Sequence, residues 1–231
     1  MRKPLVLSFA NALIALSLGL GFAARAQDAK PGDVAAGEKK IAMCEGCHNL
    51  PRYQASFPEI YKVPMIAGQN AKYIATALVG YRKGERKHPT MRAIAGSLSD
   101  QDIADVAAYY AQLGGPAGAA AAAPAASAAP AFAPTPQVAA LLTKGNCVSC
   151  HGSNFSAPID PSYPKLAGQH ADYLFVALKA YQIDHNPVMG RNNAIMMGMA
   201  RPFTQPEIKA IAAYLGSLPG DLKTVQQPRF R

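Results

Sequence analysis

The chain has 231 residues, 50% of them hydrophobic, and its 23 lysines and arginines against 14 acids give a formal charge of +9. These basic residues are dispersed, whereas nucleic-acid-binding proteins gather them on one face or element. The composition therefore argues against a nucleic-acid partner. One short basic cluster, from Arg82 to His88, is interpreted as a solvated helix end or as a docking site for an acidic partner.

The N-terminal segment has the pattern of a secretory signal peptide. A basic start, Arg2-Lys3, precedes an apolar run, and Ala24-Arg25-Ala26 has the form of a cleavage site. We predict that residues 1–26 are removed and that the mature chain is periplasmic. Its charge then falls from +9 to +6, since three basic residues leave. The alternative is an uncleaved membrane anchor, because the apolar run is near the lower length limit for a membrane span.

A tract of alanine and proline divides the rest of the chain. Residues 114–136 read GGPAGAAAAAPAASAAPAFAPTP. Such a tract lacks the side chains for a packed core, and its repeated prolines interrupt any alanine helix. We predict an extended linker between an N-terminal domain, residues 27–113, and a C-terminal domain, residues 137–231.

The two predicted domains repeat one order of motifs. Each contains C-x-x-C-H, then P-x-[IL]-A-G-Q, then an apolar segment near its end. PMIAGQNAKYIATALVGYR from Pro64 aligns without gaps with PKLAGQHADYLFVALKAYQ from Pro164, which indicates a duplicated unit. The helical spacing of apolar residues and the capping signals at Ser99 and Thr204 predict an all-α fold of two small domains with long loops.

The C-x-x-C-H motif indicates covalent attachment of haem. Its spacing places both sulfurs within one helical turn, where they reach the two vinyl groups of one haem, and the adjacent histidine reaches the iron. We therefore predict two covalently bound haem c groups. The predicted attachment residues are Cys44, Cys47, Cys147 and Cys150, and the first axial ligands are His48 and His151.

Three other interpretations of the cysteines are disulfides, thioredoxin-like redox pairs and zinc sites. A thioredoxin-like pair belongs in a βαβ context, which the sequence lacks. Zinc needs two further ligands for each motif, and the only histidines outside the motifs are His88, His170 and His185.

One methionine in each half has the register of a second axial ligand. Met91 lies 12 residues before Ile103, and the same count back from Ile208 reaches Met196. Methionine is a common second ligand of electron-transfer haems and raises their potential. We predict Met91 and Met196 as the second ligands.

Other residues compete for the same position. A slip of one residue in a loop would put Met197 in place of Met196, whereas Met199 aligns with the apolar Ile94 and is interpreted as packing. His88 and His185 are alternatives that would give bis-histidine ligation, although they do not align with each other.

The P-x-[IL]-A-G-Q segment supplies a rigid proline and a glycine that permits close backbone approach. We predict that Pro64 and Pro164 lie against the axial histidines, with a carbonyl that accepts the Nδ1 proton. Tyr73 and Tyr173 are predicted to pack beside the haem or to reach a propionate. In the simplest alternative the segment is a loop-to-helix turn capped by its glutamine.

Taken together, these residues resemble the di-haem cytochromes c of the cytochrome c4 type. The likeness rests on Cys44 to His48, Pro64 to Gln69 and Met91, and on Cys147 to His151, Pro164 to Gln169 and Met196. The resemblance implies two class I cytochrome c folds, His/Met ligation and electron transfer in the periplasm, typically toward a terminal oxidase. Two departures are residues 49–63, which lack the Gly-rich loop expected there, and the long linker.

We therefore expect an electron carrier with no substrate chemistry of its own. The expected partners are redox proteins: a membrane oxidase, a cytochrome complex or a dehydrogenase. We expect docking to be transient, and it is compatible with peripheral association with membrane complexes. Two alternatives are a dedicated electron-transfer subunit of a larger periplasmic dehydrogenase and a di-haem peroxidase, in which one iron needs an open position.

Overall fold

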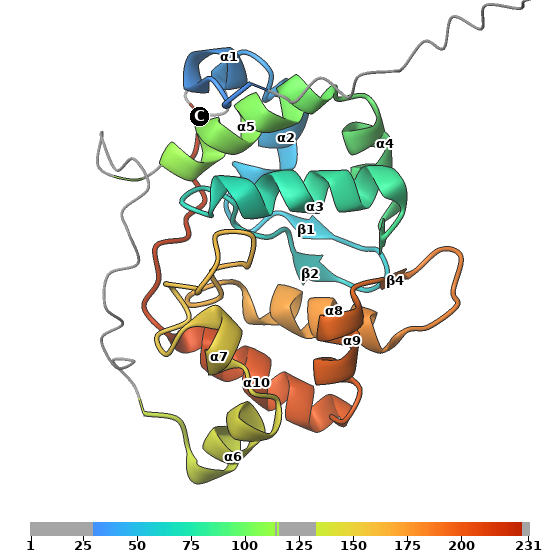
Figure 1. Cartoon of the computed structure of the whole chain (residues 1–231), viewed down its shortest axis with the longest axis vertical. Helices are drawn as coiled ribbons and strands as arrows, with labels where there is room; N and C mark the ends of the chain where they lie inside the picture. Colours follow the sequence, from blue (N-terminus) through green and yellow to red (C-terminus); the bar gives the residue numbers. More distant parts are fainter. Residues whose placement is uncertain (1–29, 114, 116–132, 228–231) are drawn as a thin grey trace, which may run out of the picture.

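The computed structural model describes residues 30–113, 115 and 133–227, which form two groups of helices stacked on each other (Figure 1). The first group contains α1 (Val34–Glu38), α2 (Ala42–His48), α3 (Ala71–Lys83), α4 (Pro89–Gly96) and α5 (Asp100–Gln112). The second contains α6 (Pro136–Lys144), α7 (Val148–His151), α8 (Ala171–Gln182), α9 (Ala194–Ala200) and α10 (Gln205–Ser217). The helical prediction is confirmed. The expected signal peptide and most of the expected linker, residues 114 and 116–132, lie outside the described residues.

The last helix of each group begins where the sequence predicts. The Ser99 hydroxyl accepts a hydrogen bond from the Asp102 N–H, and the Asp102 carboxylate accepts one from the Ser99 N–H. Thr204 and Glu207 form the same reciprocal pair. Each pair satisfies N–H groups that have no partner inside the helix, so the starts of α5 and α10 are fixed locally.

Each group has its own apolar core. In the first, Ile103, Val106 and Tyr110 of α5 are buried against α3, and the Tyr110 hydroxyl donates a hydrogen bond of 2.9 Å to the side chain of Asn49. Asn49 directly follows α2, so this bond ties the end of α2 to the core. In the second group the core gathers around Ile208 of α10, which is fully buried. Within the described residues, no helix is both long enough and apolar enough to cross a membrane.

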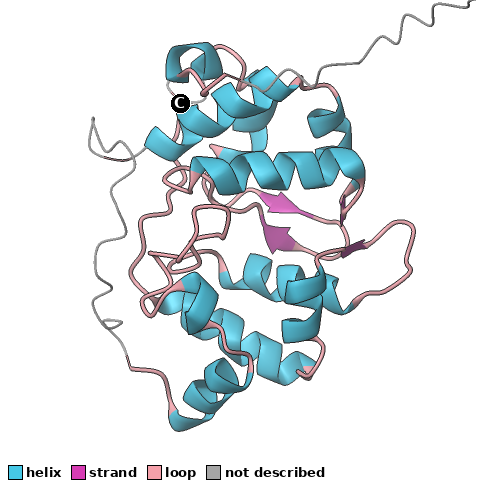
Figure 2. Ribbon diagram, in the orientation of Figure 1, coloured by secondary structure: helices cyan, strands magenta, loops and turns pink. Residues whose placement is uncertain are grey.

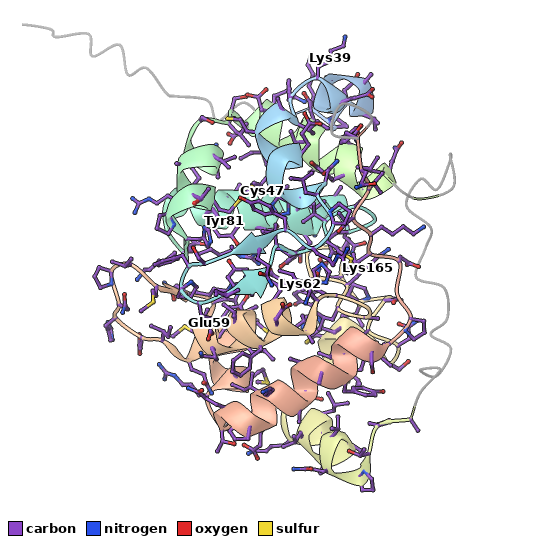
Figure 3. All side chains as sticks on the ribbon, turned by 180° about the vertical axis from the view of Figure 1, so that it is seen from behind. Lys39, Cys47, Glu59, Lys62, Tyr81 and Lys165 are labelled. Atoms are coloured by element: carbon purple, nitrogen blue, oxygen red, sulfur yellow. The ribbon has the colours of Figure 1, made fainter. Side chains whose placement is uncertain are left out.

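Residues 49–63 form a hairpin between the two groups (Figure 2). Its strands, β1 (Gln54–Ala55) and β2 (Tyr61–Lys62), are antiparallel. The Lys62 ammonium lies 3.1 Å from the Asp172 carboxylate, and the Glu59 carboxylate lies 2.7 Å from the Lys179 ammonium. Figure 3 labels Glu59 and Lys62 at this junction. The segment that departs from the family pattern therefore docks the first group onto α8 of the second.

A second pair of strands joins the groups directly. The strands β3 (Arg86–Lys87) and β4 (Gly190–Arg191) are antiparallel, with Arg86 opposite Arg191. The Lys87 ammonium also donates a hydrogen bond to the Asn186 carbonyl. The first half of the cluster, Arg82 and Lys83, is the solvated end of α3 that the sequence predicts. Its second half is not an open docking site, because Arg86 and Lys87 are used inside the molecule.

The C-terminal segment returns to the first group. The Lys223 N–H donates to the Ala67 carbonyl at 3.1 Å, and the Gln227 side chain donates to the Tyr109 hydroxyl at 3.0 Å. Figure 1 shows this segment running from α10 along the molecule toward α5. Gly68, with a φ of 81°, makes the crossing possible, because a Cβ there would lie 2.7 Å from the Asp221 carbonyl oxygen.

Candidate functional site

One cavity of about 830 Å³ opens between the two groups and is lined by both cysteine motifs. The motif residues that line it are Cys44, Cys47, His48, Cys147, Cys150 and His151. Burial raises the pKa of the Cys44 thiol to about 11 and also raises that of Cys147. The attachment residues predicted in the two halves thus face one shared, largely apolar space.

Both motif histidines are oriented by a proline carbonyl. The Nδ1 atom of His48 lies 2.9 Å from the Pro64 carbonyl oxygen, and that of His151 lies 3.1 Å from the Pro164 carbonyl oxygen. The expected contact is present in both halves. With Nδ1–H as the donor, Nε2 is left with a lone pair that could bind a metal. Burial lowers the pKa of both imidazoles, against the opposing effect of the proline carbonyl, and favours the neutral form that binds metals.

The two predicted methionine ligands occupy equivalent positions in the wall of the cavity. Met91 lies in the first turns of α4 and Met196 in those of α9, and both line the cavity. The side chain three residues earlier caps each helix, since His88 accepts from the Met91 N–H at 3.3 Å and Asn193 accepts from the Met196 N–H at 3.0 Å. The structure therefore repeats the register that the sequence predicted.

The other two methionines of α9, Met197 and Met199, differ in their position relative to the cavity. Met197 is not among the described residues that line the cavity, whereas Met199 lines it as Ile94 does. Met199 is 40% exposed, so it borders the cavity and is not part of a buried core.

The competing histidines have other positions. Although His88 lines the cavity, its Nδ1 caps α4, and burial, together with the charge of Arg191, lowers its pKa. His185 has a side chain that is 94% exposed, and His170 is the residue at the start of α8. These positions favour Met91 and Met196.

Two arginines from opposite groups meet at the cavity wall. Arg86 donates a hydrogen bond of 3.0 Å to the Tyr73 hydroxyl, and Arg191 donates one of 3.0 Å to the Tyr173 hydroxyl. Each guanidinium also lies over the ring of its tyrosine, at 5.2 Å for Arg86 and 5.5 Å for Arg191. Both arginines line the cavity. The two halves thus contribute a matched pair of cations.

These two guanidiniums lack an acidic partner within the part of the chain that the structure describes. Two lysines at the cavity differ, since Lys165 pairs with Asp221 and Lys179 with Glu59. A third, Lys87, donates to the Asn186 carbonyl. Charges removed from water are costly unless an opposite charge or dipole compensates them. Arg86 and Arg191 therefore fit a ligand that brings negative charge into the cavity.

The site has what a covalent haem requires in each half. Two cysteines are available for thioether bonds, an oriented imidazole and a methionine flank the space, and the arginine pair suits the two carboxylates that every haem carries. Fold and site together define a two-haem c-type cytochrome.

Comparisons with known proteins agree with this class. The family model for cytochrome c matches residues 137–219. Cytochrome c4 from Azotobacter vinelandii is 30% identical over 219 residues, which cover 90% of this chain and 99% of that protein. The crystal structure of reduced recombinant cytochrome c4 from Pseudomonas stutzeri superposes with a TM-score of 0.54 at 26% identity, covering 81% of this chain and 100% of that one.

A third relative has a name that refers to a partner. The thiosulfate dehydrogenase electron acceptor of Stutzerimonas stutzeri is 30% identical over 182 residues, 77% of this chain and 78% of that protein. The match to cytochrome c4 covers most of both chains at 30% identity, which is enough to assign the family. It belongs to the cytochrome c4 family, carries two covalently bound haem c groups and transfers electrons between redox proteins.

Sequence reasoning missed the arginine pair, although a signal was present. Arg86 lies five residues before Met91, and Arg191 lies five residues before Met196. Continuing the alignment of the two halves five residues before the methionines pairs Arg86 with Arg191. With that match, Arg86 would not have been assigned to a surface cluster.

The arginine pair leads to a testable prediction. Arg86→Gln removes a positive charge that disfavours ferric iron, so we expect the midpoint potential of at least one haem to fall. At a fixed potential, we expect the ratio of oxidised to reduced haem to rise about tenfold. This corresponds to a fall in midpoint potential of about 59 mV for a one-electron couple. A redox titration at pH 8, where haem carboxylates stay ionised, measures this. The control is Arg201→Gln, which removes an exposed arginine paired with Asp184 at 2.6 Å.

Proposed function

We propose that the protein is a periplasmic electron carrier in which both irons are six-coordinate. His48 and Met91 would ligate one iron, and His151 and Met196 the other. The mature chain would begin after residue 26, with one haem domain in residues 27–113 and one in residues 137–231. The C-terminal segment that lies on the first group would add a contact between the two domains.

The haem iron supplies the chemistry by alternating between its ferrous and ferric states, while the chain holds and tunes it. Cys44 and Cys47 fix the first haem, and Cys147 and Cys150 the second. The proline carbonyls orient the imidazoles, and the methionine thioethers favour a high potential. Arg86 and Arg191 would hold carboxylates of the haems at the boundary between the groups.

The observation that carries this proposal is the repeated methionine register. Each half places a thioether on the cavity wall in the first turns of a capped helix. A peroxidase needs an iron with an open position, and the two equivalent methionines argue against one.

A spectroscopic measurement tests the carrier proposal. In the oxidised protein we expect the thioether-to-ferric charge-transfer band at an intensity that corresponds to two haems per chain, and no turnover of hydrogen peroxide. A band that accounts for one haem only, together with peroxide turnover, would show that the protein is an enzyme.

A second proposal concerns the electron donor. The relative named as a thiosulfate dehydrogenase electron acceptor supports a dehydrogenase as the donor, and a terminal oxidase or cytochrome complex remains the proposed acceptor. Purification of the tagged protein from its own periplasm tests this. Recovery of a stoichiometric catalytic dehydrogenase would indicate a dedicated subunit, whereas recovery of the free chain would indicate a mobile shuttle.

A further inference from the structure

Two buried glutamines cross between the groups and bind the backbone of the opposite half. Gln169, which is 4% exposed, accepts a hydrogen bond from the Met65 N–H at 3.0 Å and donates one to the Met65 carbonyl at 2.8 Å. Its Oε1 also accepts from the N–H of His170 at 3.0 Å, which fixes the side chain. The second half thus holds one residue of the first half by two bonds.

Gln69 makes the same contact in the other direction. It is 3% exposed, accepts from the Lys165 N–H at 2.9 Å and donates to the Lys165 carbonyl at 3.0 Å. The Asn70 N–H holds its Oε1 at 2.9 Å. Asn70 and His170 occupy the N-cap positions of α3 and α8 without a capping bond from their side chains, so each glutamine combines a local bond to that residue with the contact to the opposite half.

The residues that the glutamines hold, Met65 and Lys165, directly follow Pro64 and Pro164, the prolines beside the axial histidines. The Met65 N–H and the Pro64 carbonyl belong to one peptide group, whose oxygen lies 2.9 Å from Nδ1 of His48. One unbroken chain therefore runs from the His48 imidazole through this peptide to Oε1 of Gln169. An equivalent chain runs from His151 through the peptide of Pro164 and Lys165 to Gln69.

We propose that each glutamine is a positioning residue for the haem of the opposite half. Gln169 sets the strength of the His48–Pro64 bond, and Gln69 sets that of the His151–Pro164 bond. The inference rests on the proposed ligation by His48 and His151. The boundary between the groups is then part of the environment that determines both potentials.

The direction of the effect follows from the polarisation of the peptide. When an amide N–H donates to Oε1, electron density moves toward its carbonyl oxygen, which becomes a better acceptor for the imidazole N–H. A stronger bond to Nδ1–H makes the imidazole a more basic ligand and stabilises ferric iron. Loss of Gln169 should therefore weaken this bond and raise the potential of the first haem.

The test uses the near-isosteric variants Gln169→Met and Gln69→Met in the two-haem protein. Methionine keeps the approximate volume and removes the two hydrogen bonds to the opposite half, together with the local bond to the next backbone N–H. In Gln169→Met we expect a two- to fivefold fall in the oxidised-to-reduced ratio of the first haem at a fixed potential. This equals about 20–40 mV at 59 mV per tenfold. Gln69→Met should change the second haem by a similar factor, and in each variant the haem of the variant's own half should change less.

Proton resonances of the reduced protein assign the effect to a histidine. The Nδ1–H resonance of His48 should move to higher field in Gln169→Met, and that of His151 in Gln69→Met. The control is Gln182→Met, because Gln182 donates to backbone carbonyls of its own half, Ala200 at 2.9 Å and Phe203 at 2.7 Å. It should leave the His48 resonance in place.

Shifts confined to the haem of the variant's own half, or unchanged Nδ1–H resonances in both variants, would overturn the crossed assignment. If Gln169→Met does not accumulate as a two-haem protein, Gln69→Met decides the question through His151 alone. A failure of the proposed His/Met ligation is distinguishable, because the unmodified protein would then lack a thioether-to-ferric band that accounts for two haems.

Discussion

Met91→Ala is expected to lower the midpoint potential of one haem strongly and to leave the other nearly unchanged. Loss of the thioether leaves the iron to water or to a weaker ligand, and axial ligands control potentials over about 0.8 V, so a fall on the order of 0.1–0.3 V is expected. Met196→Ala should do the same to the other haem. A redox titration monitored through the thioether-to-ferric band measures the potentials of both haems. Each variant should lose about half of the band's intensity.

Met197→Ala is the matched control for Met196→Ala. Both residues lie in α9, and Met197 is not among the described residues that line the cavity. We expect Met197→Ala to keep the full band and both potentials. If instead it lowers one potential while Met196→Ala does not, the register of the second half is wrong by one residue.

Replacing both cysteines of the second motif is expected to halve the covalently bound haem. The chain with Cys147→Ser and Cys150→Ser has no thiol left for a thioether bond in that half, because the four cysteines of the chain all belong to the two motifs. Mass spectrometry of the denatured protein should therefore find one haem per chain in place of two.

The reciprocal control is the chain with Cys44→Ser and Cys47→Ser. It should also carry one haem, attached to the other half. A variant that retains two haems after denaturation would show that haem is attached elsewhere. Loss of both haems in each variant would show that attachment in either half depends on the other half, as two sites lining one cavity permit.

The sequence predicted what depends on local pattern and on the repeat. Cys44, His48 and Met91 follow from the motif and its register, and Ser99 caps α5 as its spacing predicts. Because the two halves are similar, each motif could be checked against its counterpart in the other half. The predicted contact of Pro64 and Pro164 with the histidines of the two motifs is present.

The contacts between the halves have no such local pattern. The pairing of β3 with β4 and the path of residues 218–227 over the first group depend on how the two copies pack. The sequence offered only a local role for Gln69, as the cap of its own turn, in the simplest alternative. Its side chain does bind the Asn70 N–H, but its other partner, Lys165, is far away in the chain. Such long-range partners become visible only once the tertiary structure brings the residues together.

We propose that both haems have methionine as the second ligand and that these ligands are Met91 and Met196. The most direct test is the proton spectrum of the reduced two-haem protein, in which the ring current of the haem moves the methyl resonance of a ligating methionine far upfield. With methionine labelling and residue-specific assignment, we predict two such methyl signals, one from Met91 and one from Met196. A single upfield methyl signal, or one that arises from Met197, would contradict ligation by Met91 and Met196.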